Sequence, residues 1–132
     1  MSAFVDPEKT YDITVYWRPN PANANKLTIL EKAPAATEPP CETMTMSFRY
    51  PDYAMERRIM DQSTVVGPNG PMINALVLQS VMLYTLAKSW TLKDDKGGSL
   101  PIDSAAISAL NPAIVRTLVG ALHEEMSQAG LF

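Results

Sequence analysis

The residues that could carry chemistry in this chain are few and lie far apart. There is one histidine, His123, and one cysteine, Cys41. Nucleophilic catalysis of the Ser-His-Asp or Cys-His type needs an imidazole beside the nucleophile, and "HEEM" lacks the second histidine of an HExxH zinc motif. We therefore predict that His123 is a solvated or capping side chain near a helix C-terminus, and that Cys41 is a small strand or loop residue.

The carboxylates and glycines also lack the spacing that a ligand would require. "GPNGP" has glycines three apart, but its prolines remove the backbone amides that a phosphate would use. "DDKGGSLPIDSA" has neither the alternating acidic residues nor the closing glutamate of a calcium loop. Glu124 and Glu125 are neighbours on a predicted helix and point about 100 degrees apart. We predict no catalytic residue, no metal site and no cofactor, and hence a protein that is not an enzyme.

The stretch "SWTLKDDKGGSLPID", residues 89–103, is instead predicted to be a structural joint. Its Asp-Gly-rich centre is typical of a tight turn, with apolar residues packing inward on each side. Its last residue is suited to cap the helix that follows. The residues of this joint are Trp90, Asp94, Gly97, Gly98, Pro101 and Asp103.

The composition predicts one compact domain with no charged partner surface. The chain has 132 residues, of which 46% are hydrophobic, and its 11 basic and 14 acidic residues give a net charge of −3. No basic patch predicts nucleic-acid binding. The longest apolar stretch is interrupted by polar residues, which argues against a membrane span. A single cysteine and no basic-then-apolar leader favour the cytosol.

The elements that position these residues change character near residue 50. Alternation of apolar and polar residues over 11–18, 26–32 and 42–50 predicts three short strands, separated by "PNPANAN" and the proline-rich linker "APAATEPP". From residue 51 the pattern favours helices over about 52–64, 72–89, 104–110 and from 112 onward, with "VVGPNG" as a hinge-like breaker. Pro71 and Pro112 suit first helical positions, Asp103 and Asn111 suit N-caps, and Gly130 is predicted to end the last helix. The fold class is therefore α+β: a small antiparallel β meander in the β-rich region 1–50, followed by a bundle of about four helices in 51–132.

Methionine is abundant, and its position raises an alternative to core packing. Eight methionines occur, five of them between positions 44 and 72. Methionine most often fills an irregular core, but it also suits surfaces that accept variable partners. The half-sheet and the largely apolar helix 72–89 lack obvious cover in so short a chain, so self-association or a partner helix would bury them. The partner-binding hypothesis names Met44, Met46, Phe48, Tyr50, Met55, Met60, Leu78 and Met82.

The order of elements resembles one known family. "YPDYAMERRIMDQS", a central helix ending in "LYTLAKSW", the turn "TLKDDKGGSLPID" and the final "LNPAIVRTLVGALHEEM" follow one another in about residues 42–129. This layout resembles that of the tail assembly chaperones of long-tailed bacteriophages. The resemblance implies a non-catalytic helper in the host cytoplasm that binds the helical tape measure protein and recruits tail tube subunits. The alternative is a permanent structural subunit of a virion tail or baseplate, contacting neighbouring virion subunits through its strands.

Overall fold

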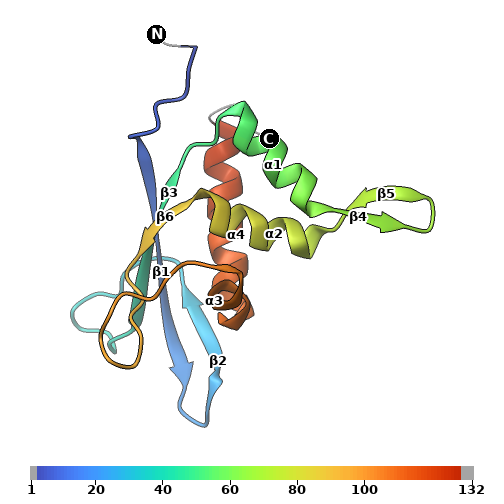
Figure 1. Cartoon of the computed structure of the whole chain (residues 1–132). Helices are drawn as coiled ribbons and strands as arrows, with labels where there is room; N and C mark the ends of the chain where they lie inside the picture. The colour runs from blue at the N-terminus through green and yellow to red at the C-terminus, as the bar shows by residue number, and fades with distance from the viewer. Residues whose placement is uncertain (1–2, 129–132) are drawn as a thin grey trace.

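The chain folds into an α+β structure, as the sequence predicts, and a computed structural model describes its residues 3–128 (Figure 1). Three strands come first: β1 (Thr10–Asn20), β2 (Asn23–Leu30) and β3 (Glu42–Arg49). The remaining described elements are, in chain order, α1 (Tyr53–Ser63), β4 (Thr64–Gly67), β5 (Gly70–Ile73), α2 (Ala75–Leu86), β6 (Ala87–Trp90), α3 (Ser104–Ala109) and α4 (Pro112–Gln128).

The main sheet has four antiparallel strands, in the order β2-β1-β3-β6. This order differs from the predicted meander, because β1 lies between β2 and β3 and a fourth strand joins the far edge of β3. The register pairs Ile13 with Met46 and Val15 with Met44. Because side chains alternate across a strand, these residues share one face, and they are all buried.

The helices cover that buried face and pack against one another. In Figure 1, α4 runs alongside the sheet, α2 leads away from β6 and passes in front of α4, and α1 lies farther from the sheet. α4 contacts β1 and β2, and α2 contacts α1, α3 and α4. The core therefore combines strand residues with residues from every described helix, such as Ile59, Leu83, Ile107 and Leu118. The apolar face of the sheet needs no second copy of the chain to cover it.

Each helix begins at a side chain that accepts hydrogen bonds from its first turn. The Asp52 carboxylate accepts from the Met55 amide at 2.8 Å, and the Asp103 carboxylate accepts from the Ala106 amide at 2.8 Å. The Asn111 side chain accepts from the Ala113 amide, with Pro112 at the first helical position. The caps at Asp103 and Asn111 agree with the sequence prediction, and α1 begins at Tyr53, one residue after the predicted position. The predicted role of Gly130 lies outside the described residues.

The predicted helix 72–89 is too long at both ends. Asn74, not Pro71, precedes the helix: its side chain accepts hydrogen bonds from the amides of Leu76 and Val77. Pro71 lies in β5, opposite Val66. At the other end, residues 87–90 leave the helix because the open edge of β3 offers them backbone partners, and this tertiary contact outweighs helix propensity.

Candidate partner-binding surface

Half of the residues named by the partner-binding hypothesis lie in the core, and for these the hypothesis is wrong. Met44, Met46 and Phe48 occupy alternate positions of β3 on the face that the helices cover, and Met82 lies on the inner side of α2. All four side chains are buried, so no partner can reach them in this fold. The alternative reading of methionine as a core-filling residue is correct at these positions.

Three further residues of that set are half-buried against the core. Tyr50, Met55 and Leu78 pack on it from its margin. The Tyr50 hydroxyl donates a hydrogen bond of 2.5 Å to Glu125 Oε1 on α4. This hydrogen bond, with burial and the negative charge of Glu125, raises the pKa of Tyr50 to about 12. Of the predicted set only Met60, near the end of α1, is classed as exposed.

Within residues 3–128, four of the eight exposed large apolar side chains lie on the β4-β5 hairpin and the first turn of α2, and the other four are Phe4, Val5, Tyr53 and Met60. Val66 is 91% exposed and Leu76 is 75% exposed, and Met72 and Ile73 are also exposed. Figure 1 shows the hairpin projecting away from the sheet and the other helices. We call Val66, Met72, Ile73 and Leu76 the hairpin patch. Val66 and Ile73 lie on one face of the hairpin and Met72, which is paired with Val65, lies on the other, so a single chain leaves apolar side chains in water on both faces.

The local sequence explains why this hairpin forms and why its apolar side chains are exposed to solvent. Gly67 pairs with Gly70 across a loop of Pro68 and Asn69, and Gly70 has a φ of +108°, a conformation that side chains disfavour. The pairing places Val66, Pro71 and Ile73 on one hairpin face. A two-stranded hairpin cannot bury both of its faces by itself.

One signal in the sequence does mark this region. Residues 62–87 contain no Asp, Glu, Lys, Arg or His. Depletion of charge together with methionine is typical of the centre of a protein-protein interface. The turn residues of "VVGPNG" predict only a break between helices, so they do not by themselves indicate this surface.

A shallow groove of about 280 Å³ continues from the hairpin patch through Leu76. It lies between α2, α3 and the beginning of α4, and most of its lining is apolar or uncharged. The lining residues are Leu76, Gln79, Ser80, Ile107, Ser108, Leu110, Pro112, Val115 and Arg116. Arg116 is the one charged residue among them, so the groove combines apolar walls with a single positive charge.

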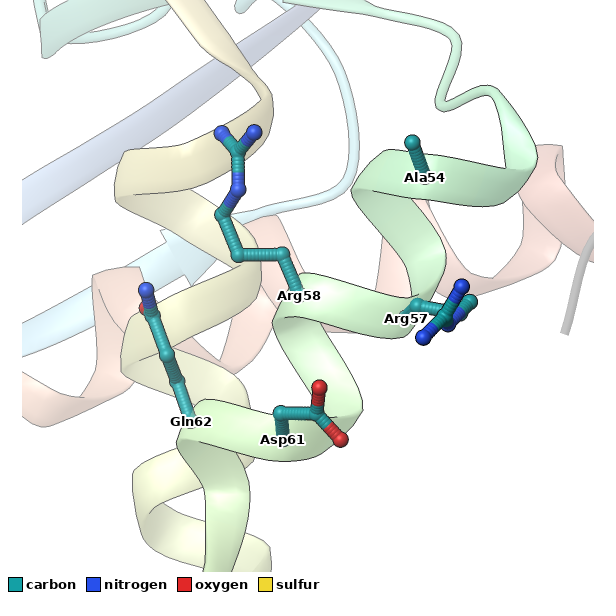
Figure 2. Close-up of a pocket in the computed structure, with 5 residues that line it drawn as sticks. All are labelled: Ala54, Arg57, Arg58, Asp61 and Gln62. Atoms are coloured by element: carbon teal, nitrogen blue, oxygen red, sulfur yellow. The ribbon is translucent and has the colours of Figure 1, made fainter.

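A second shallow depression, of about 350 Å³, lies along the outer side of α1. Figure 2 shows that Arg58 and Gln62 extend from one side of the helix, toward α2, whereas Arg57 and Asp61 lie on the other side. Gln62 connects the two helices, since its side-chain oxygen lies 3.3 Å from the Tyr84 hydroxyl of α2. The Arg57 guanidinium lies 6.0 Å from the Tyr53 ring.

The predicted joint forms a turn closed by its own side chains. Asp94 Oδ1 accepts hydrogen bonds from the amides of Lys96 and Gly98, and Gly97 adopts a φ of +79°. The Trp90 Nε1–H donates to the Leu100 carbonyl oxygen at 2.7 Å, and Pro101 lies in the same surface depression. These contacts position the polypeptide between β6 and α3.

The residues considered for catalysis are not brought together. His123 is exposed on α4 and Cys41 is half-buried just before β3. Within residues 3–128, no three or more His, Cys, Asp or Glu side chains are grouped so that they could hold a metal ion. None of the helices in this part of the chain has the length and apolar character needed to cross a membrane.

Comparison with protein families, with characterised proteins and with solved structures finds no significant match to this chain.

Proposed function

We propose that this chain is a non-catalytic tail assembly chaperone of a long-tailed bacteriophage, which binds the helical tape measure protein and helps to recruit tail tube subunits. The observation that carries the proposal is the hairpin patch: an uncharged apolar surface projects into water. Its exposure and lack of charge suit reversible binding of an apolar helical partner. The order of the C-terminal elements, which resembles that of the family, supports the same function.

The proposed mode of action is temporary burial of apolar surface. A long amphipathic helix that has not yet been covered by tube subunits would aggregate through its apolar stripe. The hairpin patch would cover part of that stripe in the host cytoplasm, and tube subunits would then displace the chaperone. This exchange requires binding that is modest per site, which a small, solvent-exposed patch can provide.

Co-expression with the candidate tape measure protein tests the proposal. The parent chain should raise the soluble fraction of that protein and co-purify with it, and Val66→Asp should abolish both effects. Tyr53→Ser is the matched control, because it also removes an exposed apolar side chain but lies at the opposite end of α1 from the hairpin. Equal effects of Val66→Asp and the parent would contradict the proposal.

Mass spectrometry of purified particles separates the proposal from the alternative of a permanent tail or baseplate subunit. A chaperone is absent from the mature virion, whereas a structural subunit is present in stoichiometric amount. Detection at a fixed ratio to the tube protein would replace the chaperone function by the structural one.

A further inference from the structure

The outward side of α2 lies between two arginines that have no acidic partner. In the part of the chain that the structure describes, the one ion pair joins Arg18 to Glu38. Arg58 on α1 and Arg116 on α4 therefore keep unpaired guanidinium groups. Arginine binds carboxylates in a planar, two-pronged geometry, so both residues are available to a partner's acidic side chains.

The residues of α2 that these arginines flank form a line along the helix. Leu76, Ser80 and Tyr84 are four positions apart and thus lie on one side of it. Leu76 is exposed, and the other two are half-buried. We call these three residues the α2 stripe. Its three residues are uncharged, and two of them, Leu76 and Ser80, line the groove between α2, α3 and α4.

A different element borders the α2 stripe on each side. On one side Gln62 touches Tyr84, and Arg58 lies one turn earlier on the same side of α1 (Figure 2). On the other side Leu76 and Ser80 line the groove that contains Arg116. A helix lying along the stripe would thus have one arginine on each side.

The charge balance around the stripe is opposite in sign to that of the chain. Arg57, Arg58 and Asp61 give the α1 depression a net charge of +1, and Arg116 gives the groove a net charge of +1. The whole chain has a net charge of −3. Figure 2 draws Asp61 on the Arg57 side of α1, and within the described residues no ion pair joins it to Arg58.

We propose that the α2 stripe receives an amphipathic helix of a partner protein whose apolar face is bordered on both sides by carboxylates. The apolar face packs on Leu76 and the hairpin patch, and the two rows of carboxylates pair with Arg58 and Arg116. This inference rests on the proposed partner-binding function and adds the chemistry of the partner to it. Complementary charge selects the partner and its orientation, while apolar contact provides most of the affinity.

Two synthetic peptides test the inference on the full-length chain. Both are about 20 residues long and carry leucines at helical spacing. One has glutamates bordering the leucine face, and the other has lysines at the same positions. Fluorescence anisotropy should show that the glutamate peptide binds about tenfold more tightly at low salt, with the preference shrinking at high salt.

A second test reverses the charges of the two arginines on the protein. The double variant Arg58→Glu, Arg116→Glu should reverse the preference, so that the lysine peptide binds more tightly. Lys93→Glu is the control for surface charge, because Lys93 is exposed in the turn after β6, away from α2. A circular dichroism melt of each variant verifies the fold. Equal binding of the two peptides, or a preference unaffected by the double variant, would overturn the inference.

The other occupant of the stripe would be a second copy of the chain. Analytical ultracentrifugation then would show a dimer that the double variant dissociates, and the peptides would not bind; this result also overturns the inference. Failure of either kind leaves the co-expression result unaffected. Conversely, peptide selectivity without solubilisation of the tape measure protein would remove the chaperone function and keep the acidic-helix site.

Discussion

Leu76 and Leu83 lie on the same helix but differ in exposure. Substitution by alanine should therefore weaken partner binding at Leu76 and destabilise the fold at Leu83. Leu76 is 75% exposed, whereas Leu83 is 0% exposed. Full burial of a leucine side chain contributes about 1.5–3 kcal/mol. Three-quarters of that value, about 1–2 kcal/mol, is still to be gained at Leu76 when a partner covers it.

Leu76→Ala should therefore weaken partner binding about 5- to 30-fold, since 1.4 kcal/mol corresponds to about a factor of ten in Kd. Its effect on the free energy of unfolding should be below about 1 kcal/mol, because the side chain buries little surface in the free chain and alanine favours helix. Leu83→Ala should instead destabilise the fold by about 2–5 kcal/mol through the cavity it leaves.

Urea unfolding gives the stability of both variants, and anisotropy with a labelled tape measure fragment or the glutamate peptide gives the affinity. The affinity of Leu83→Ala is compared under conditions where it remains folded, and it should match that of the parent. If Leu76→Ala binds as tightly as the parent, the hairpin patch and the α2 stripe are not the binding surface. A large loss of stability at Leu76 would show that the residue is covered within the free chain.

Three further predictions concern stability. Trp90→Phe should cost about 1–3 kcal/mol in urea unfolding, because the Leu100 carbonyl oxygen loses its donor while most of the ring remains. Asp103→Ala should cost about 1 kcal/mol in the same assay, through loss of the cap on α3. Tyr50 has a pKa of about 12 in the folded chain against 10.0 in its ordinary state, so the unfolded chain releases this proton first. The contribution of Tyr50 to the free energy of unfolding is fully present below about pH 10 and is lost as the pH rises to about 12. Tyr50→Phe should therefore flatten the pH dependence of the free energy of unfolding between these two pH values.

The parts of the fold that were predicted correctly are those that local chemistry determines. The alternation in β1 and β3 identifies strands because one side of each strand faces the helices and the other faces water. The beginnings of α1, α3 and α4 follow from a short polar side chain that accepts from the first turn. Neither feature depends on contacts that are distant in the sequence.

The parts that were missed depend on what lies far away in the chain. Residues 87–90 continue the apolar helix pattern, and only the presence of an open edge on β3 draws them into the sheet. The hairpin did have a local signal, since Gly67 and Gly70 enclose the two-residue loop of Pro68 and Asn69, and all four residue types are typical of turns. Pro68 and Pro71 argue against strands, because proline has no backbone N–H to donate. Pro71 is nevertheless tolerated in β5, because the other edge of this strand is unpaired in the two-stranded sheet.

The candidate site cannot be predicted from residue type because one part of the uncharged segment packs in the core and another part is exposed to solvent. Residue type alone assigns the apolar residues of the uncharged segment 62–87 together, either to the core or to a partner. In the structure the end of the segment, at Val81, Leu83 and Leu86, is buried, while its beginning, at Val66 and Leu76, projects into water. Residue type reports how much apolar surface the segment has, but only the direction in which the hairpin leaves α1 decides which part the chain covers itself.

The position of the exposed Leu76 on a helix whose other end is buried links partner binding to the stability of the folded chain. Because the exposed Leu76 and the buried Leu83 and Leu86 belong to one helix, a partner that binds Leu76 also restrains α2, which contacts α1, α3 and α4. Binding energy gained at Leu76 thereby adds to the stability of the folded chain as the partner concentration rises.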